Sequence, residues 1–241
     1  MTLLKTIMVF IATGIIMIIC IPLGIMTSLL RFLGLRKPMT IGTYRIAQVW
    51  AILVIKISGC RPVVTGQEWI PKKGGVCFVS NHGSIFDIAL HLAYIGRPFG
   101  FIAKKELAMI PLLNIWILLL DGLFIDRQDI RKAIGTINRG VRHIKAGGAM
   151  IIFPEGTRSK GRGLLPFRSG SLKLATKAGV PIIPVAIIGS YDVFEKNFRV
   201  QRVPVKVAFG KPIMTEDIPM EKRKTQLADL VHGVIAEALQ E

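Results

Sequence analysis

A histidine and an aspartate five positions apart, His82 and Asp87, have the residue types and the spacing to do acid–base chemistry. The ordinary pKa of imidazole lies close to neutrality, so His82 could act as a general base. Asp87, across a strand-to-helix turn, could accept the other ring N–H and fix the tautomer, as in catalytic triads. A substrate hydroxyl would then be the nucleophile. The alternative is a structural role, in which Ser84 or Asp87 caps the following helix.

A second stretch, Gly-Leu-Phe-Ile-Asp-Arg at 122–127, places an arginine at the end of an apolar run. If that run is a strand, Arg127 could present its planar guanidinium to a phosphate group. The alternative is an ordinary surface ion pair between Asp126 or Asp129 and a neighbour. The pattern alone does not separate these two interpretations.

A third stretch, Phe-Pro-Glu-Gly-Thr-Arg-Ser at 153–159, follows another apolar run and leads into a strongly basic segment. Proline holds the residue before it extended, and glycine permits an unusual turn. Side chains at the carboxyl end of a strand are exposed to ligands in α/β folds. The turn and its basic surroundings therefore predict an anion-binding pocket, with these candidate residues: Glu155, Gly156, Thr157 and Arg158.

A fourth stretch, Val-Pro-Ile-Ile-Pro-Val at 180–185, brackets apolar residues with two prolines. This pattern is typical of a strand entry or of the wall of an apolar pocket. It carries little functional information by itself. The residues proposed from it for an acyl-chain or donor pocket are Val180, Pro181, Ile182 and Pro184.

The elements that must position these residues are short strands alternating with helices. Strands are expected at 75–80, 99–103, 149–153, 182–187 and 203–209, and helices at 84–94, 131–145, 171–178 and 225–239. The segment 111–120 is an unusually apolar loop or helix. This alternation predicts an α/β domain over residues 59–241, with a central mixed sheet flanked by helices.

Residues 1–58 form a separate N-terminal segment that we expect to be a two-helix membrane anchor. Residues 6–30 carry no charge and are long enough to span a bilayer, although Pro22 and Gly24 interrupt the run. A second apolar segment, 44–58, follows a turn at 31–39. The pair could form a hairpin within one leaflet, or a spanning helix followed by an interfacial one. A cleavable signal peptide is the main alternative, but the apolar stretch is longer than usual for one.

The net charge of +17 predicts an anionic partner. Residues 1–58 hold six basic residues and no acid, which fits a membrane better than nucleic acid. No pattern interleaves aromatic residues with the basic loops, so no nucleic-acid partner is expected. The three cysteines show no metal-binding spacing, and no metal site is expected. Nothing in the pattern indicates an oligomeric state.

The four stretches, in this order, resemble those of the glycerolipid acyltransferase superfamily, and specifically the bacterial 1-acylglycerol-3-phosphate acyltransferases. The similarity covers about residues 66–190. It implies that His82 is the general base and Asp87 its partner. It also implies that Lys105, Arg127 and the Glu155–Arg158 turn bind the glycerophosphate, and that the fourth stretch contributes to the acyl or donor pocket.

The resemblance further implies a reaction and a setting. An acyl-ACP or acyl-CoA thioester would acylate the sn-2 hydroxyl of lysophosphatidic acid, giving phosphatidic acid with no cofactor and no covalent enzyme intermediate. The protein would contact membrane lipids at a bacterial-type inner membrane. The excess of positive charges after residue 30 places the catalytic domain on its cytoplasmic face. The alternatives are another acceptor, such as glycerol-3-phosphate or another lysophospholipid, and a basic lipid-binding protein without activity.

Overall fold

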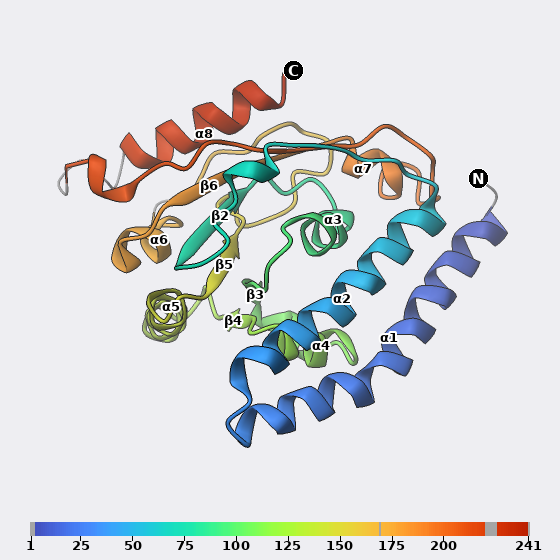
Figure 1. Ribbon diagram of the computed structural model, residues 1–241. Coiled ribbons are helices and arrows are strands. Elements are labelled where there is room, and N and C mark those ends of the chain that lie inside the picture. The colour runs from blue at the N-terminus through green and yellow to red at the C-terminus, as the bar shows by residue number, and fades with distance from the viewer. Residues whose placement is uncertain (1–2, 169, 220–225, 241) are drawn as a thin grey trace.

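A mixed β-sheet forms the centre of the molecule, as the alternation of strands and helices predicts (Figure 1). The structure is a computed structural model that describes residues 3–168, 170–219 and 226–240. Within these residues the sheet has seven strands in the order β1-β7-β6-β2-β5-β3-β4. All neighbouring strands are parallel except β6 and β7. The strands are β1 (Val63–Thr65), β2 (Val76–Ser80), β3 (Gly100–Lys104), β4 (Leu123–Ile125), β5 (Ala149–Ile152), β6 (Ile182–Ile188) and β7 (Lys206–Phe209).

Helices cover both faces of the sheet. Successive residues of a strand point to opposite sides, and because those of the central strands are almost all apolar, both faces must be buried. Phe78 belongs to one hydrophobic core and Cys77 and Val79 to the other. The first core packs under α2 (Arg36–Ser58), α3 (Phe86–Tyr94) and α4 (Leu113–Leu119). The second packs under α5 (Ile130–Lys145), α6 (Lys173–Ala178) and α8 (Gln226–Ala238). The remaining helices are α1 (Leu3–Phe32), α7 (Ser190–Val193) and the short 3-10 turns Gln67–Trp69, Lys105–Met109 and Thr215–Asp217.

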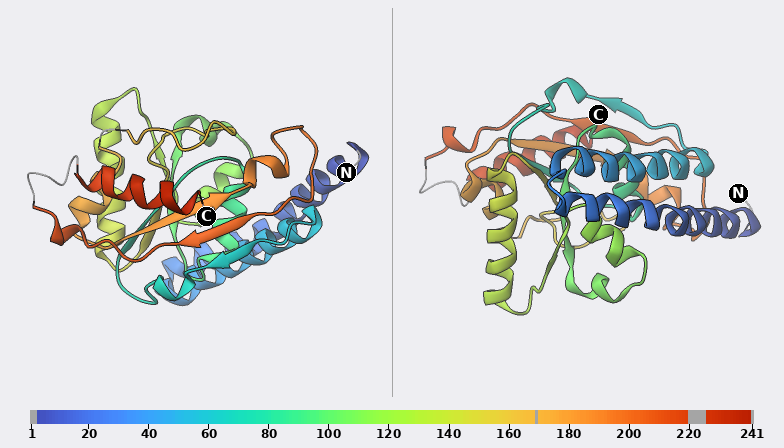
Figure 2. Two further views of the ribbon diagram at one scale, coloured as in Figure 1. Left: turned by 90° about the horizontal axis from the view of Figure 1, so that it is seen from above. Right: turned by 60° about the horizontal axis from the view of Figure 1, so that its bottom comes forward.

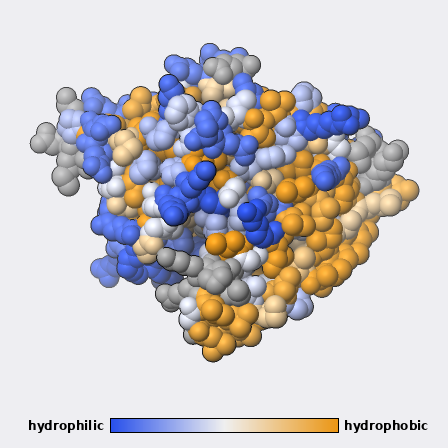
Figure 3. Space-filling model, in the orientation of Figure 1, coloured by the Kyte–Doolittle hydropathy of each residue, from blue (hydrophilic) through white to orange (hydrophobic). Residues whose placement is uncertain are grey.

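The N-terminal segment forms two long apolar helices, α1 and α2, which lie side by side with α4 next to α1 (Figure 2, right). Thr27 and Thr43 share a hydrogen bond of 2.7 Å between the two helices. Both helices are long and apolar enough to cross a membrane, over Thr6–Thr27 and Thr40–Ser58. Many of their large apolar side chains face outward, and the resulting hydrophobic surface covers the right side of the molecule in Figure 3.

Pro22 lies inside α1 without ending it, and Gly24 allows the close approach of α4. A Cβ atom at Gly24 would come within 2.7 Å of Leu119 Cδ1. The turn between α1 and α2 lies within the predicted segment 31–39. The side chains of its basic residues Arg31, Arg36 and Lys37 lie outside the described residues.

Helix α2 ends at Ser58, the last residue of the expected N-terminal segment, and Gly59 adopts the left-handed conformation typical of a helix C-cap. However, α2 also belongs to the core of the sheet domain. The Tyr44 hydroxyl donates to the carbonyl of Leu92 at 3.1 Å, and Gln48 donates to Ala93 at 3.0 Å. The second half of the N-terminal segment therefore packs on α3 as an integral part of the fold.

The expected helices and strands occur with ends shifted by a few residues, and the apolar 111–120 segment contains α4. The sequence did not predict β1 or α7, which have three and four residues. Segments this short carry too little periodicity to recognise. The view from above shows α8 lying across the sheet (Figure 2, left).

Candidate active site

The carboxyl ends of β2, β3, β4 and β5 lie at one edge of the sheet, because these strands are parallel neighbours. His82 follows β2, Lys105 follows β3, Arg127 follows β4 and the 153–159 stretch follows β5. The topology thus brings three of the four predicted stretches, and Lys105, to the same edge. In open α/β sheets this edge is where ligands bind.

His82 and Asp87 form the hydrogen-bonded pair that their spacing predicts. Asp87 Oδ2 lies 2.8 Å from His82 Nδ1 and also accepts from the amide of Ser84 at 2.9 Å. The Asp87 side chain is fully buried, whereas that of His82 is 17% exposed. The Asp87 contact at Nδ1 leaves Nε2 as the ring nitrogen that can face a substrate. The pair has the geometry of an oriented general base.

One aromatic neighbour, Phe153, packs directly on the His82 ring, and His91 in turn packs on Phe153. Phe153 stacks on the His82 ring with 4.1 Å between ring centroids. The ring of His91, which is fully buried on α3, meets Phe153 edge-on. His91 Nδ1 lies 2.6 Å from the backbone carbonyl of Asp87, and burial lowers the pKa of His91 to about 4. His91 is therefore a neutral packing residue that supports Asp87.

Glu155 connects the third stretch to the histidine loop. Its carboxylate accepts from the backbone amides of His82, at 2.7 Å, and Leu165, at 3.1 Å. The amide of Ser159 in turn donates to the carbonyl of His82 at 2.7 Å. Burial is the main influence on Glu155 and raises its pKa, while the two amide hydrogen bonds oppose this shift. The Glu155 carboxylate thus positions the loop, and its contacts are with protein amides.

Gly156 and Arg127 join the second stretch to the third. Gly156 has a φ of 73°, a backbone conformation that residues other than glycine rarely adopt. A Cβ atom there would also collide with the Arg168 guanidinium. Its carbonyl accepts a hydrogen bond from Arg127. Thr157 follows on the exposed surface of the turn. Arg127 and Arg168 therefore gather at a turn whose backbone only glycine allows.

Lys105 and Asp126 pair at the ends of β3 and β4, with 3.0 Å between Nζ and Oδ2. This hydrogen bond raises the pKa of Lys105 and lowers that of Asp126. Asp129 forms a second ion pair, with Lys132 at 3.2 Å. The ion-pair interpretation of the second stretch thus applies to its aspartates, while Arg127 reaches across to the third stretch.

The fourth stretch begins at the opposite edge of the sheet and runs along β6 toward its carboxyl end. In the β2–β6 register Ile182 faces Cys77, at the start of β2, whereas Ile187 binds Asn81, next to His82. Val180 and Ile182 are buried in the second hydrophobic core. Pro184 borders a different cavity, beside Trp69 and Phe209. The structure therefore does not bring Val180, Pro181, Ile182 and Pro184 together with His82.

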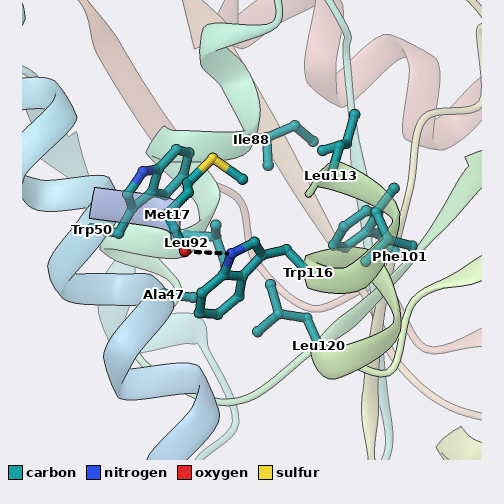
Figure 4. A pocket seen from close by; sticks show the side chains of 10 residues that line it. Met17, Ala47, Trp50, Ile88, Leu92, Phe101, Leu113, Trp116 and Leu120 are labelled. Atoms are coloured by element: carbon teal, nitrogen blue, oxygen red, sulfur yellow. Dashed lines mark hydrogen bonds between the residues drawn. The ribbon is translucent and has the colours of Figure 1, made fainter. Parts of the chain in front are cut away.

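An apolar cavity of about 50 Å³ instead adjoins the helix that carries Asp87 (Figure 4). Ile88 and Leu92 of α3 form one wall, and Met17 of α1 forms part of another. The Trp116 indole donates to the Met17 carbonyl at 3.4 Å, as the dashed line in Figure 4 shows. The complete lining is Met17, Ala47, Trp50, Ile88, Leu92, Phe101, Leu113, Trp116, Ile117 and Leu120.

Glu195, in the turn after α7, is a residue of the site that the sequence analysis missed. One carboxylate oxygen pairs with Arg158 and the other accepts from the amide of Ile85 at 3.0 Å. No spacing rule relates a glutamate at 195 to the loop of His82, because Glu195 reaches Ile85 of that loop only through the packing of α7 on α3. Only the tertiary structure identifies it.

Comparison with known proteins confirms the resemblance. A family model described as Acyltransferase matches residues 61–188. Curated 1-acyl-sn-glycerol-3-phosphate acyltransferases of Borreliella burgdorferi and Escherichia coli are both 35% identical to the chain, over 58% and 63% of its length and 56% and 61% of theirs. A probable member from Mycoplasma genitalium is 33% identical over 81% of this chain and 75% of its own. The matches thus span little more than half of some relatives.

A solved structure supports the same relationship over nearly the whole chain. The crystal structure of the 1-acyl-sn-glycerophosphate (LPA) acyltransferase PlsC from Thermotoga maritima matches with a TM-score of 0.82 and 27% sequence identity. The match covers 98% of this chain and 95% of that one, so it includes the two N-terminal helices. The chain therefore belongs to the Acyltransferase family, as a relative of the 1-acyl-sn-glycerol-3-phosphate acyltransferases.

Proposed function

We propose that the protein transfers a fatty acyl group from a thioester to the sn-2 hydroxyl of 1-acyl-sn-glycerol-3-phosphate and so produces phosphatidic acid. The observation that carries this proposal is the His82–Asp87 pair, bound through Glu155 to an arginine-rich turn at the same sheet edge. A general base beside a cluster of cations suits an acceptor that carries both a hydroxyl and a phosphate. The names of the relatives support the same acceptor.

In the proposed mechanism, His82 Nε2 removes the proton of the acceptor hydroxyl as its oxygen attacks the thioester carbonyl. Asp87 holds the Nδ1 proton and stabilises the imidazolium that forms. The imidazolium then returns the proton to the departing thiolate. The acyl group passes directly from donor to acceptor, without a covalent intermediate on the protein. General base catalysis of this type contributes about 10²–10⁴ in rate.

The acceptor phosphate would bind at the sheet edge where Lys105, Arg127 and Arg158 follow β3, β4 and β5, with the backbone of Gly156 and Thr157 beside it. A phosphomonoester carries about −1.5 to −2 charges near pH 7, so several cations are needed to compensate it. Arg127 and Arg158 offer planar donors suited to phosphate oxygens. Glu155 serves this site indirectly, because its carboxylate holds the backbone of the histidine loop.

The apolar cavity beside α3 is the proposed place for an acyl chain, in preference to the fourth stretch. Ile88 lines it and directly follows Asp87 in the chain, so the cavity lies against the helix that carries the partner of the base. The oxyanion of the tetrahedral intermediate needs hydrogen-bond donors as well. The amides of Ser84 and Ile85 already donate to Asp87 and Glu195, so neither is a candidate.

The two apolar helices are the proposed membrane attachment. Their outward-facing side chains would enter the bilayer, where both acceptor and product reside. The cavity lies between these helices and α3, which would allow an acyl chain to reach it from lipid. We propose an inner-membrane location with the catalytic domain in the cytoplasm, where an acyl-ACP or acyl-CoA donor is available.

The test is product formation by the purified full-length protein in mixed micelles, with 1-oleoyl-glycerol-3-phosphate as acceptor and palmitoyl-ACP or palmitoyl-CoA as donor. Mass spectrometry should detect phosphatidic acid, and a folded His82→Ala variant should make it at least about a hundredfold more slowly. The matched control is His143→Ala, which replaces a partly buried histidine in the last turn of α5. Acylation of glycerol-3-phosphate or another lysolipid alone would refute the acceptor, and no acylation of any acceptor would refute the enzyme.

A further inference from the structure

Glu195 links the two parts of the site that the proposed mechanism requires to act together. Its Oε1 atom pairs with the guanidinium of Arg158, in the 153–159 stretch. Its Oε2 atom accepts at 3.0 Å from the amide of Ile85, which lies between His82 and Asp87 in the chain and directly precedes α3. A single carboxylate thus bridges the proposed phosphate ligand and the loop of the general base.

The environment of Glu195 makes this bridge more than a surface ion pair. The Glu195 side chain is 10% exposed and that of Arg158 is 33% exposed. Ion pairs between exposed side chains contribute little, whereas charge-assisted hydrogen bonds in partly buried sites are stronger and more directional. The Ile85 amide is also one of the donors that the first turn of α3 cannot satisfy by itself. Glu195 therefore accepts a hydrogen bond from an amide at the start of the helix that carries Asp87.

The turn that carries Glu195 is itself held in place on several sides. Phe194 packs edge-on against Phe10 of α1 at 4.8 Å between ring centroids. The amides of Lys196 and Gln201 donate to the carbonyls of Tyr191 and Val193, at 3.2 and 2.7 Å. Because this turn is anchored to α1 by the Phe194 side chain and to α7 by backbone hydrogen bonds, the Glu195 carboxylate can impose a position on Arg158.

We infer that Glu195 is a positioning residue that sets affinity for the phosphate of the acceptor by aiming Arg158, while it fixes the His82–Asp87 loop through Ile85. This inference rests on the proposed function. It extends the site beyond residue 188, where the family match ends. Arg158 has further guanidinium N–H groups, so it can bind a phosphate oxygen while Glu195 still holds it.

Two substitutions separate the two contacts. Glu195→Gln keeps a carbonyl oxygen that can accept from Ile85 but loses the charge that holds Arg158. It should raise KM for lysophosphatidic acid about tenfold and leave kcat and the donor KM within about threefold. Glu195→Ala loses both contacts, so it should lower kcat as well. Asp192→Asn, on the exposed Asp192–Lys196 pair of the same segment, is the matched control and should match the wild type.

A double-mutant cycle with Arg158→Ala tests whether Glu195 acts through Arg158. If it does, adding Glu195→Gln to Arg158→Ala should cause no further change in the acceptor KM. The inference is overturned if the two effects multiply, if Glu195→Gln leaves KM unchanged in an active protein, or if it lowers only the melting temperature. A wild-type protein that does not acylate lysophosphatidic acid would refute the proposed function itself, and with it this inference.

Discussion

Replacing Asp87 with asparagine would test the role assigned to the histidine–aspartate pair. An asparagine side chain has nearly the same size and would keep an oxygen for the Ser84 amide, which now donates to Asp87 Oδ2 at 2.9 Å. The substitution would remove the negative charge 2.8 Å from His82 Nδ1. The new NH₂ group could also donate to Nδ1, which would move the ring proton to Nε2. That tautomer cannot accept the proton of a substrate hydroxyl.

The two effects give the expected magnitude. A hydrogen bond to a charged group contributes about 1.5–3 kcal/mol, so losing it from the imidazolium alone slows the reaction by about 10- to 150-fold. Reversal of the tautomer removes the base as well and brings the total loss in kcat to about 10²–10⁴. Asp87 is fully buried behind His82, so KM for the acceptor and for the donor should change little.

The assay is steady-state kinetics of phosphatidic acid formation by purified protein in mixed micelles, with circular dichroism melts to confirm folding. Asp129→Asn is the matched control, because Asp129 pairs with Lys132 on the surface, and its kcat should stay within about threefold of the wild type. A folded Asp87→Asn protein that retained more than about a tenth of the wild-type kcat would refute the role of Asp87 as the partner of a general base.

Buried features of the site support three further predictions. Burial lowers the pKa of His91 to about 4 in the folded protein. As the pH falls from about 6.5 to 4, His91 is therefore protonated in the unfolded chain but stays neutral in the folded one. The free energy of unfolding should drop by up to about 3 kcal/mol in that window. The melting temperature of the wild type should fall with pH in this window, and that of His91→Gln should not. Equal pH dependence in the two proteins would contradict the role of His91. Ala47→Leu, which narrows the apolar cavity, should shift product formation toward shorter acyl chains in a mass-spectrometric competition, whereas Val49→Leu on the exposed face of α2 should not. Gly156→Ala should lower kcat/KM more than about tenfold. The new methyl group would displace the Arg168 side chain, and the left-handed backbone would cost about 1–2 kcal/mol more. Gly163→Ala is the control, because Gly163 has a similar positive φ but open space around it. An equal loss of kcat/KM in that variant would show that backbone strain alone causes the effect.

The sequence determined those features that depend on residues close together in the chain. Alternating strands and helices follow from local hydrophobic periodicity, and most of the predicted elements occur within a few residues of their expected ends. The His82–Asp87 contact also spans only five positions and crosses one strand-to-helix turn. The same is true of the apolar N-terminal segment, which is recognisable from the length of its uncharged run.

The tertiary structure decided which of the predicted residues meet. Strand order depends on pairings between distant segments, and no local pattern specifies that β2 lies between β6 and β5. That order brings Arg127 to the carbonyl of Gly156. It also places Val180 and Ile182 at the far edge of the sheet, although their apolar character alone fits a pocket wall as well as a core.

Residues outside recognisable patterns depended most on the fold. The apolar cavity is assembled from α1, α2, α3, α4 and β3, whose residues each look like ordinary core in the sequence. Glu195 reaches Arg158 and Ile85 from 37 and 110 positions away. The sequence by itself determined the chemistry available to this protein, since residue type and local spacing set it. The packing of distant segments decided which groups work together, because contacts between them form only when the sheet and its helices assemble.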